Sequence, residues 1–293
     1  MGSQNSQMRS TLAAGSNRWV RRVAAVALLC HMQAWATRGA RLDAQGVRNA
    51  AGLTATAVVR LAQDRDTGRD SRADMRMRLF DRQGRSRERV MTLISKRGAG
   101  SAGDRTLLRF SSPNDIRNTG FLVWEHPDKE DERFLFLPAL GRVRRIAGAE
   151  KQESFVGSDL SYEDIGGRQT ADYTYAFVDE RATWIAPDGS KKDAWVVESR
   201  AKDAGVPYPR STSTILKESL VMVHAEEFNR HNERGKVFDV RTVEKVDGIW
   251  TVLALSVVNE KTRTRTDLET AAIRYNVGLT DDDFSRRRLE QVP

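Results

Sequence analysis

Strand-length segments recur along the chain about every eight to twelve residues, with few helical stretches between them. Residues 75–79 (MRMRL) alternate apolar and arginine side chains, the pattern of a strand with one buried face. Turn-forming residues such as 81–84 (DRQG) separate one segment from the next. Strands spaced this closely form a single antiparallel sheet, and so long a sheet curls or closes. The sequence therefore predicts a mainly β chain.

Two segments depart from this pattern and are predicted to be helical. Residues 53–61 place apolar side chains on one helical face. Residues 279–290 have acidic side chains near the start and arginines near the end, which suits the helix dipole. Between them, residues 173–180 and 182–192 are predicted as separate strands, with a turn at residues 187–190 (PDGS). Residues 261–266 (KTRTRT) are predicted as a strand with all of its charge on one face.

The amino terminus has the three parts of a secretory signal peptide. Four arginines precede a short apolar run at residues 23–30, and residues 34–36 (AWA) are of the kind that a signal peptidase reads. The run is too short to cross a bilayer. We expect residues 1–36 to be a cleaved signal peptide, 37–52 a linker and 53–293 the folded domain. An amphipathic tail on a cytosolic protein is the alternative.

Cleavage after residue 36 changes the chemistry that the chain can perform. It lowers the net charge from +8 to +4, because four arginines and no acidic residue precede that point. It also removes Cys30, the one cysteine. Disulfides, thiolate metal sites and a cysteine nucleophile are therefore excluded from the mature chain.

The sequence lacks the patterns of a catalytic or metal site. It has no Gly-x-Ser-x-Gly elbow and no glycine-rich phosphate loop, and His126, His224 and His231 have no His-Glu-x-x-His or paired-ligand spacing. The acidic side chains within residues 159–164 do not have calcium-loop spacing. We therefore expect no enzyme activity, no cofactor and no metal ion. We expect no nucleic-acid binding either, because basic residues are dispersed among acidic ones.

Residues 134–164 combine an apolar strand with a cluster of arginines. Residues 134–140 (FLFLPAL) carry no charge, yet Arg142, Arg144 and Arg145 follow almost at once. A curved sheet that is apolar on its concave face can enclose acyl chains, or it can pack an ordinary core against helices. The pattern alone fits both arrangements.

The same stretch resembles the signature of the outer-membrane lipoprotein-sorting protein family, the LolA-like proteins often associated with RND-type exporters. The matching segments are residues 137–140 (LPAL), 143–146 (VRRI), 155–159 (FVGSD) and 162–164 (YED). Weaker matches extend the resemblance to most of the chain after residue 53.

The resemblance implies an α+β fold: a strongly curved antiparallel sheet that forms an unclosed LolA/LolB-like β-barrel with a few lid helices. It implies a periplasmic carrier that binds lipid or lipoprotein acyl chains in a hydrophobic cavity and transfers them between membranes. The implied partners are the lipid or lipoprotein cargo and an RND-type inner-membrane exporter. A hydrolase acting on the bound lipid and a non-enzymatic scaffold beside an exporter are the alternatives.

Two sets of residues are the expected site. The cavity is expected to be lined by Phe121, Trp124, Phe134, Phe136, Leu140, Val143, Ile146, Phe155 and Tyr162. Strand alternation places Arg142 and Arg144 on one face and Arg145 on the other. We expect one set of these arginines to lie at the cavity mouth, where it contacts a lipid phosphate or holds the lid closed. An internal ion pair with an acidic residue of 159–164 is the alternative.

Overall fold

The computed structural model describes residues 52–291 except residues 100, 101, 128 and 204. The expected signal peptide and all of the expected linker but its last residue lie outside the described residues. Thirteen strands form one sheet in which every strand is antiparallel to its neighbours. The strands are β1 (Asp70–Phe80), β2 (Ser86–Lys96), β3 (Arg105–Ser112), β4 (Gly120–Trp124), β5 (Glu132–Leu137), β6 (Arg142–Ile146), β7 (Tyr173–Ile185), β8 (Lys191–Ala201), β9 (Arg210–Leu216), β10 (Met222–Phe228), β11 (Arg234–Val246), β12 (Ile249–Asn259) and β13 (Thr264–Tyr275).

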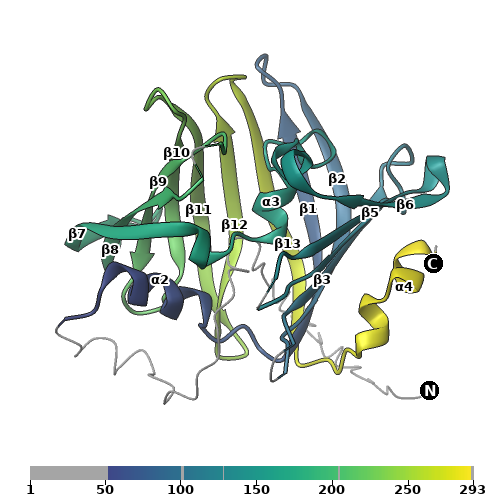
Figure 1. Ribbon diagram of the computed structural model, residues 1–293, viewed down its shortest axis with the longest axis horizontal. Helices are drawn as coiled ribbons and strands as arrows, with labels where there is room; N and C mark the ends of the chain where they lie inside the picture. The colour runs from purple at the N-terminus through teal and green to yellow at the C-terminus, as the bar shows by residue number, and fades with distance from the viewer. Residues whose placement is uncertain (1–51, 100–101, 128, 204, 292–293) are drawn as a thin grey trace, which may run out of the picture.

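The sheet is wound outward from its middle. The chain runs from β1 to β6 at one edge, crosses to β7 at the other edge, and returns until β13 pairs with β1. The sheet curls into a barrel (Figure 1). The barrel is unclosed because its two edge strands, β6 and β7, do not pair with each other. This confirms the predicted mainly β, strongly curved and unclosed fold.

The segment between the two edge strands, residues 147–172, passes through the concave side of the sheet. We call it the connector. It contains η2 (Gly148–Gln152), η3 (Phe155–Gly157), α3 (Tyr162–Gly166) and η4 (Thr170–Asp172). Figure 1 shows α3 between the two arms of the curved sheet. The connector thus takes the place of the pairing that would close the barrel.

Large side chains fill the arm of the barrel that contains β1–β4. Met75, Phe110 and Phe121 are fully buried there. Phe155 of the connector packs against Phe110, Phe121 and Tyr162, with ring centroids 5.9, 5.4 and 5.5 Å away. Rings at these separations fill volume efficiently and interact favourably with one another. This arm is a packed core.

Strand β5 is apolar on both faces because both faces are covered. Leu135 belongs to the interior cluster, whereas Phe134 and Phe136 point to the outside of the barrel. There they pack against the C-terminal segment, residues 279–291, which Figure 1 shows outside the curve of the sheet. Burial on both faces explains why the strand carries no polar alternation.

The helical predictions were close to the observed elements. The first predicted helix is α2 (Ala55–Gln63), which begins after Thr54, whose hydroxyl accepts a hydrogen bond from the Ala57 amide. The closing segment is two elements rather than one helix: η5 (Asp281–Phe284) and α4 (Arg286–Glu290). Ser285 is extended between them and caps α4.

Two strand boundaries were predicted wrongly. Residues 173–180 and 182–192 are not separate strands, because β7 continues to Ile185 and irregular register near Asp179 absorbs the polar residues. Residues 261–263 form a turn rather than part of a strand, and β13 begins at Thr264. Arg263 adopts a left-handed φ of 57°, which interrupts an extended backbone.

Candidate functional site

A cavity of about 110 Å³ lies in the other arm of the barrel, against β7–β11. Helix α2 and the connector form its remaining walls. Its apolar lining consists mainly of Val59 and Ala62 from α2 and Val197, Ile215, Met222 and Phe238 from the strands. The two arms of one sheet therefore differ: one is filled, and the other keeps an internal space.

Small side chains explain why space remains in this arm. Ser199, Ser211 and Ser213 line the cavity from β8 and β9, and Ala225 lines it from β10. The interior of β1–β4 includes larger side chains, among them three methionines and two phenylalanines. Short side chains cannot span the distance to the connector, so a void is left. The Ser199 and Ser211 hydroxyls lie 2.6 Å apart and hydrogen-bond to each other.

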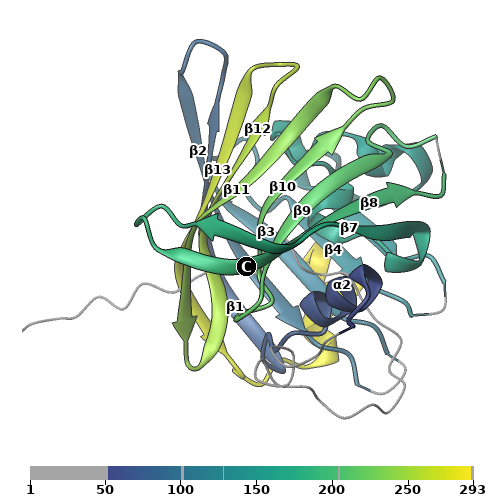
Figure 2. The ribbon, with the colours of Figure 1, turned by 90° about the vertical axis from the view of Figure 1, so that its left-hand side faces the viewer.

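Helix α2 covers the cavity from the side of β7–β9. Its buried residues Val58 and Val59 pack in one cluster with Trp195 and Ile215 of the sheet. Figure 2 shows α2 beside β7. A hydrogen bond from the Thr170 hydroxyl to Gln63 Oε1, 2.5 Å long, joins α2 to the connector. Apolar contacts are non-directional, so a short helix held largely by them can shift with the loss of few specific bonds.

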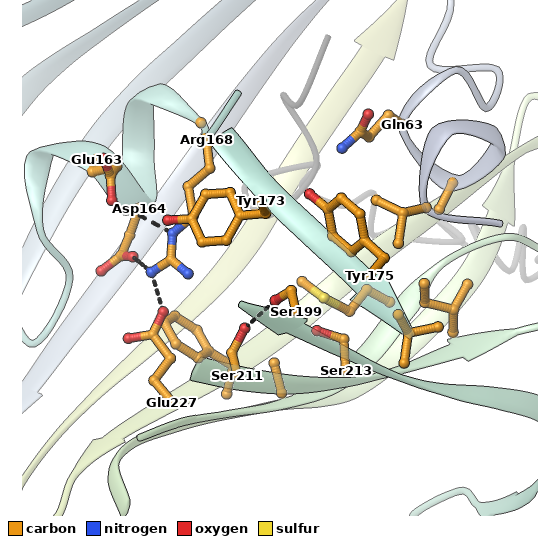
Figure 3. Close-up of a pocket in the computed structure, with 18 residues that line it drawn as sticks. Gln63, Glu163, Asp164, Arg168, Tyr173, Tyr175, Ser199, Ser211, Ser213 and Glu227 are labelled. Atoms are coloured by element: carbon orange, nitrogen blue, oxygen red, sulfur yellow. Dashed lines mark hydrogen bonds and ion pairs between the residues drawn. The ribbon is translucent and has the colours of Figure 1, made fainter. Parts of the chain in front are cut away.

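Four charged side chains line one end of the cavity: Glu163, Asp164, Arg168 and Glu227. Together with Lys236, which pairs with Asp164, we call them the charged cluster. The Arg168 guanidinium lies between Asp164 and Glu227 (Figure 3); it donates to Glu227 and is 3.4 Å from Asp164 Oδ1. Lys236 Nζ donates to Asp164 Oδ2 at 2.7 Å. The cluster joins the connector to β10 and β11 across the interior.

The charged cluster has one more acidic than basic group, so its net charge is −1 when every member is ionised. Burial opposes ionisation of Asp164, but Lys236 and Arg168 outweigh it and hold the pKa of Asp164 below its usual value. Burial raises the pKa of Glu227, although Arg168 opposes this shift. Both cations are therefore committed to carboxylates within the cluster.

Three polar atoms of the cavity lining are buried and have no hydrogen-bond partner among the described residues. They are Gln63 Nε2, Tyr175 Oη and Glu227 Oε2. Gln63 is 8% exposed and Glu227 is 3% exposed. Burial raises the pKa of Tyr175, so its hydroxyl stays neutral. An unpaired buried polar group costs about 1–3 kcal/mol, which makes these atoms the natural contacts of a bound molecule.

None of the nine apolar residues expected to line a cavity lines this one. Four of them lie in the interior cluster: Phe121, Ile146, Phe155 and Tyr162. Four others pack on the outside of the barrel with the C-terminal segment: Trp124, Phe134, Phe136 and Val143. Leu140 is 56% exposed. Strand alternation sends these side chains to two faces, and each face is covered by a different segment.

The three arginines of β6 do not line the cavity either. Arg142 and Arg145 are exposed. Arg144 is half-buried and pairs with Glu150 of the connector, with Nη1 2.9 Å from Oε1. Arg144 therefore forms a partly exposed ion pair with Glu150, six residues further along the chain, and not the expected internal pair with an acidic residue of 159–164.

The cavity residues come from parts of the chain that the sequence did not single out. Ser211 and Ser213 alternate along a predicted strand, and small inward side chains at every second position are the one sequence signal of a void there. Arg168 and Glu227 are 59 positions apart, so their pairing has no local signature. The strands were predicted, but their shared interior was not.

Comparisons with known proteins agree with this architecture. A family model described only as an uncharacterized protein matches residues 102–291. A domain described as that of an outer membrane lipoprotein-sorting protein from Vibrio parahaemolyticus is 27% identical, with a TM-score of 0.72 over 81% of this chain and 98% of the other. A DUF1329 family protein from Desulfovibrio piger is 28% identical, with a TM-score of 0.72 over 80% and 97% of the two chains.

A third similar structure is a LolA superfamily protein from Nitrosomonas europaea. It is 14% identical, with a TM-score of 0.61 over 81% of this chain and 100% of the other, and shows a shared fold. No curated protein matches the chain. None of the helices in the described part of the chain has the length and apolar character that a bilayer-spanning helix requires.

Proposed function

We propose that this protein is a carrier for lipid or for the acyl chains of lipoproteins. The chain belongs to the family matched over residues 102–291, and it has the LolA-like fold. Similarity to a lipoprotein-sorting domain at 27% identity over nearly the whole of that domain supports this class of function. The observation that carries the proposal is the interior cavity beside β7–β11, which is apolar along most of its wall and is covered by α2.

The size of the cavity indicates how an acyl chain would enter. At about 110 Å³ it is smaller than the roughly 300 Å³ at which small-molecule sites begin. Movement of α2 away from Trp195 and Ile215 would extend the apolar wall without breaking the sheet. We therefore interpret α2 as a lid that moves aside when an acyl chain enters.

The cellular location of the carrier and its exporter partner are inferred from the sequence. The expected signal peptide and the resemblance together favour a periplasmic protein that moves its cargo between membranes with an RND-type exporter. Burial of acyl chains releases about 0.8 kcal/mol per methylene, so two chains of ordinary length bind strongly. Release of the lipid then needs a partner that binds it more tightly, or an exporter that uses energy to remove it. Transfer of labelled lipid between vesicles, with and without such an exporter, tests this part.

The same cavity does not favour the hydrolase alternative. Among the described residues that line it there is no histidine or cysteine, and Ser199 and Ser211 share a hydrogen bond in which one hydroxyl donates to the other. A hydrolase must hold its nucleophile beside a general base. A carrier returns its lipid intact, whereas a hydrolase releases products, and mass spectrometry of the bound lipid distinguishes the two.

A cavity-filling variant tests the location of the site. Ala225 is buried and lines the cavity, so Ala225→Leu places three more carbon atoms in the space that an acyl chain would occupy. We expect affinity for the neutral fluorophore N-phenyl-1-naphthylamine and for co-purified lipid to fall by about tenfold or more, which corresponds to loss of roughly two methylene contacts.

The matched control is Ala176→Leu, which adds the same atoms at an exposed position of β7. It should bind as the unmodified protein does. Native mass spectrometry of the gently purified protein supplies a second measurement, since a carrier should hold lipid at near-unit stoichiometry. An empty protein that binds no fluorophore would support the scaffold alternative and overturn the carrier.

A further inference from the structure

The unpaired atoms of the cavity lining offer both kinds of hydrogen-bonding group. Gln63 Nε2 is a donor, Glu227 Oε2 is an acceptor, and the Tyr175 hydroxyl is either. They come from α2, β10 and β7, so they surround the space rather than cluster on one wall. In Figure 3 the Tyr175 ring lies between Gln63 and the labelled serines. A molecule that satisfies them needs an acceptor and a donor of its own.

The charges around the cavity do not favour an anion. Arg168 is engaged by Asp164 and Glu227, and Lys236 by Asp164. Arg60 of α2 acts on Tyr175 electrostatically, but it is exposed and does not line the cavity. A carboxylate or phosphate brought beside a cluster of net charge −1 would lose its hydration without gaining an uncommitted cation.

We propose, building on the carrier function above, that the cavity selects acyl lipids whose head is uncharged and carries both a carbonyl and a hydroxyl group. A monoacylglycerol has this chemistry: its ester carbonyl accepts from Gln63 and Tyr175, and its hydroxyls donate to Glu227. Fatty acids and phosphate-bearing single-chain lipids lack a matching partner for their charge. The acyl chain lies against the apolar wall that Val197, Ile215 and Met222 help to form.

The test compares three molecules with the same chain length: 1-lauroylglycerol, laurate and dodecyl phosphate. Each is titrated calorimetrically into the full-length protein at neutral pH, below its micelle concentration. We expect 1-lauroylglycerol to bind at least about tenfold more tightly than either anion. Tyr175→Phe should weaken 1-lauroylglycerol binding by about three- to tenfold, the effect of one lost hydrogen bond, and leave laurate binding unchanged.

A second tyrosine provides the matched control. The Tyr275 hydroxyl is 2.9 Å from Thr251 Oγ1 and lies outside the cavity, so Tyr275→Phe should lower the denaturation midpoint and leave binding unchanged. Tyr175→Phe removes an unpaired hydroxyl and should not lower the midpoint. If Tyr175 had only a structural role, Tyr175→Phe would lower the denaturation midpoint as Tyr275→Phe does, and it would not weaken lipid binding specifically.

The outcomes separate the two proposals. Equal binding of all three molecules, tighter binding of an anion, or an unchanged Tyr175→Phe variant overturns the head-group selectivity and leaves the carrier function standing. Binding of none of the three overturns both.

Discussion

At the scale of single residues, the stretch 155–159 illustrates how a recognisable motif can serve the fold. Phe155 is buried among aromatic rings, while the next residue, Val156, adopts a left-handed φ of 50° that is unfavourable for a β-branched side chain. The Asp159 carboxylate accepts hydrogen bonds from the hydroxyls of Thr264 and Thr266 on β13. The burial of Phe155 and the hydrogen bonds of Asp159 hold the strained backbone at Val156 between them. These residues therefore fix the path of the connector.

His224 and Asp239 form a pair whose effect on stability depends on pH. His224 Nδ1 lies 2.7 Å from Asp239 Oδ1, and this hydrogen bond raises the pKa of His224 and lowers that of Asp239. The histidine therefore stabilises the fold below its unfolded pKa, and this contribution is lost as pH rises through its folded pKa. The aspartate contributes above its unfolded pKa. Both act between about pH 4 and pH 6.5.

We expect Asp239→Asn to lower the pKa of His224 and to flatten the pH dependence of the unfolding free energy above about pH 6.5. Titration of the imidazole resonances by NMR measures the first effect, and urea denaturation at several pH values measures the second. If the pKa of His224 stays raised in the variant, nearby Glu226 rather than Asp239 is responsible.

At the scale of elements, the C-terminal segment depends on its contact with the sheet. Helix α4 has five residues, too few to be stable alone. Phe284 and Leu289 are fully buried against the outside of the barrel, and Trp124 Nε1 donates to the Phe284 carbonyl at 2.7 Å. The segment exists as a helix because it covers the outward apolar face of β4 and β5.

We expect Phe284→Ala to lower the free energy of unfolding by about 3–5 kcal/mol, because the removed ring leaves a cavity among the aromatic and aliphatic side chains of its cluster. Chemical denaturation followed by tryptophan fluorescence measures it, and the emission of Trp124 should shift to the red as water reaches the indole. Arg287→Ala, an exposed change in α4, is the control. A loss below about 1 kcal/mol would show that the segment adds little to the fold.

At the scale of the whole molecule, the connector and the charged cluster hold the two arms together. The sheet is unclosed between β6 and β7, so contacts across its interior take over the task that edge pairing performs in a closed barrel. The charged cluster supplies such contacts beside the cavity, where apolar packing is interrupted. Its ion pairs link the connector to β10 and β11.

We expect Arg168→Met to destabilise the protein by about 3–5 kcal/mol, because Asp164 and Glu227 would face each other with Lys236 as their remaining described cation. Adding Glu227→Gln removes the carboxylate that loses its ion-pair partner, because Asp164 keeps Lys236, and should restore part of the loss. Urea denaturation of the single and double variants gives the coupling energy between the two sites. Additive effects would mean that the ion pair is not energetically important.

The strand pattern by itself predicted a curved antiparallel sheet, and the resemblance of residues 134–164 predicted its LolA-like form. Both depend on local patterns that can be read from the sequence. Buried and exposed side chains alternate in β1, whereas β5 and β12 are apolar on both faces. The prediction of two strands in place of β7 was wrong, because the polar residues near Asp179 are accommodated by an irregular register with the neighbouring strand β8. Local sequence determines the type of an element better than its ends.

The sequence determined which side chains alternate between the two faces of each strand, but the tertiary structure decided what each face meets. Phe121 and Phe134 look equally suited to a cavity, yet one packs on the connector and the other on the C-terminal segment. The cavity formed instead where small residues of β8–β10 face α2. A void depends on the combined size of side chains that are distant along the chain, and only folding brings them together.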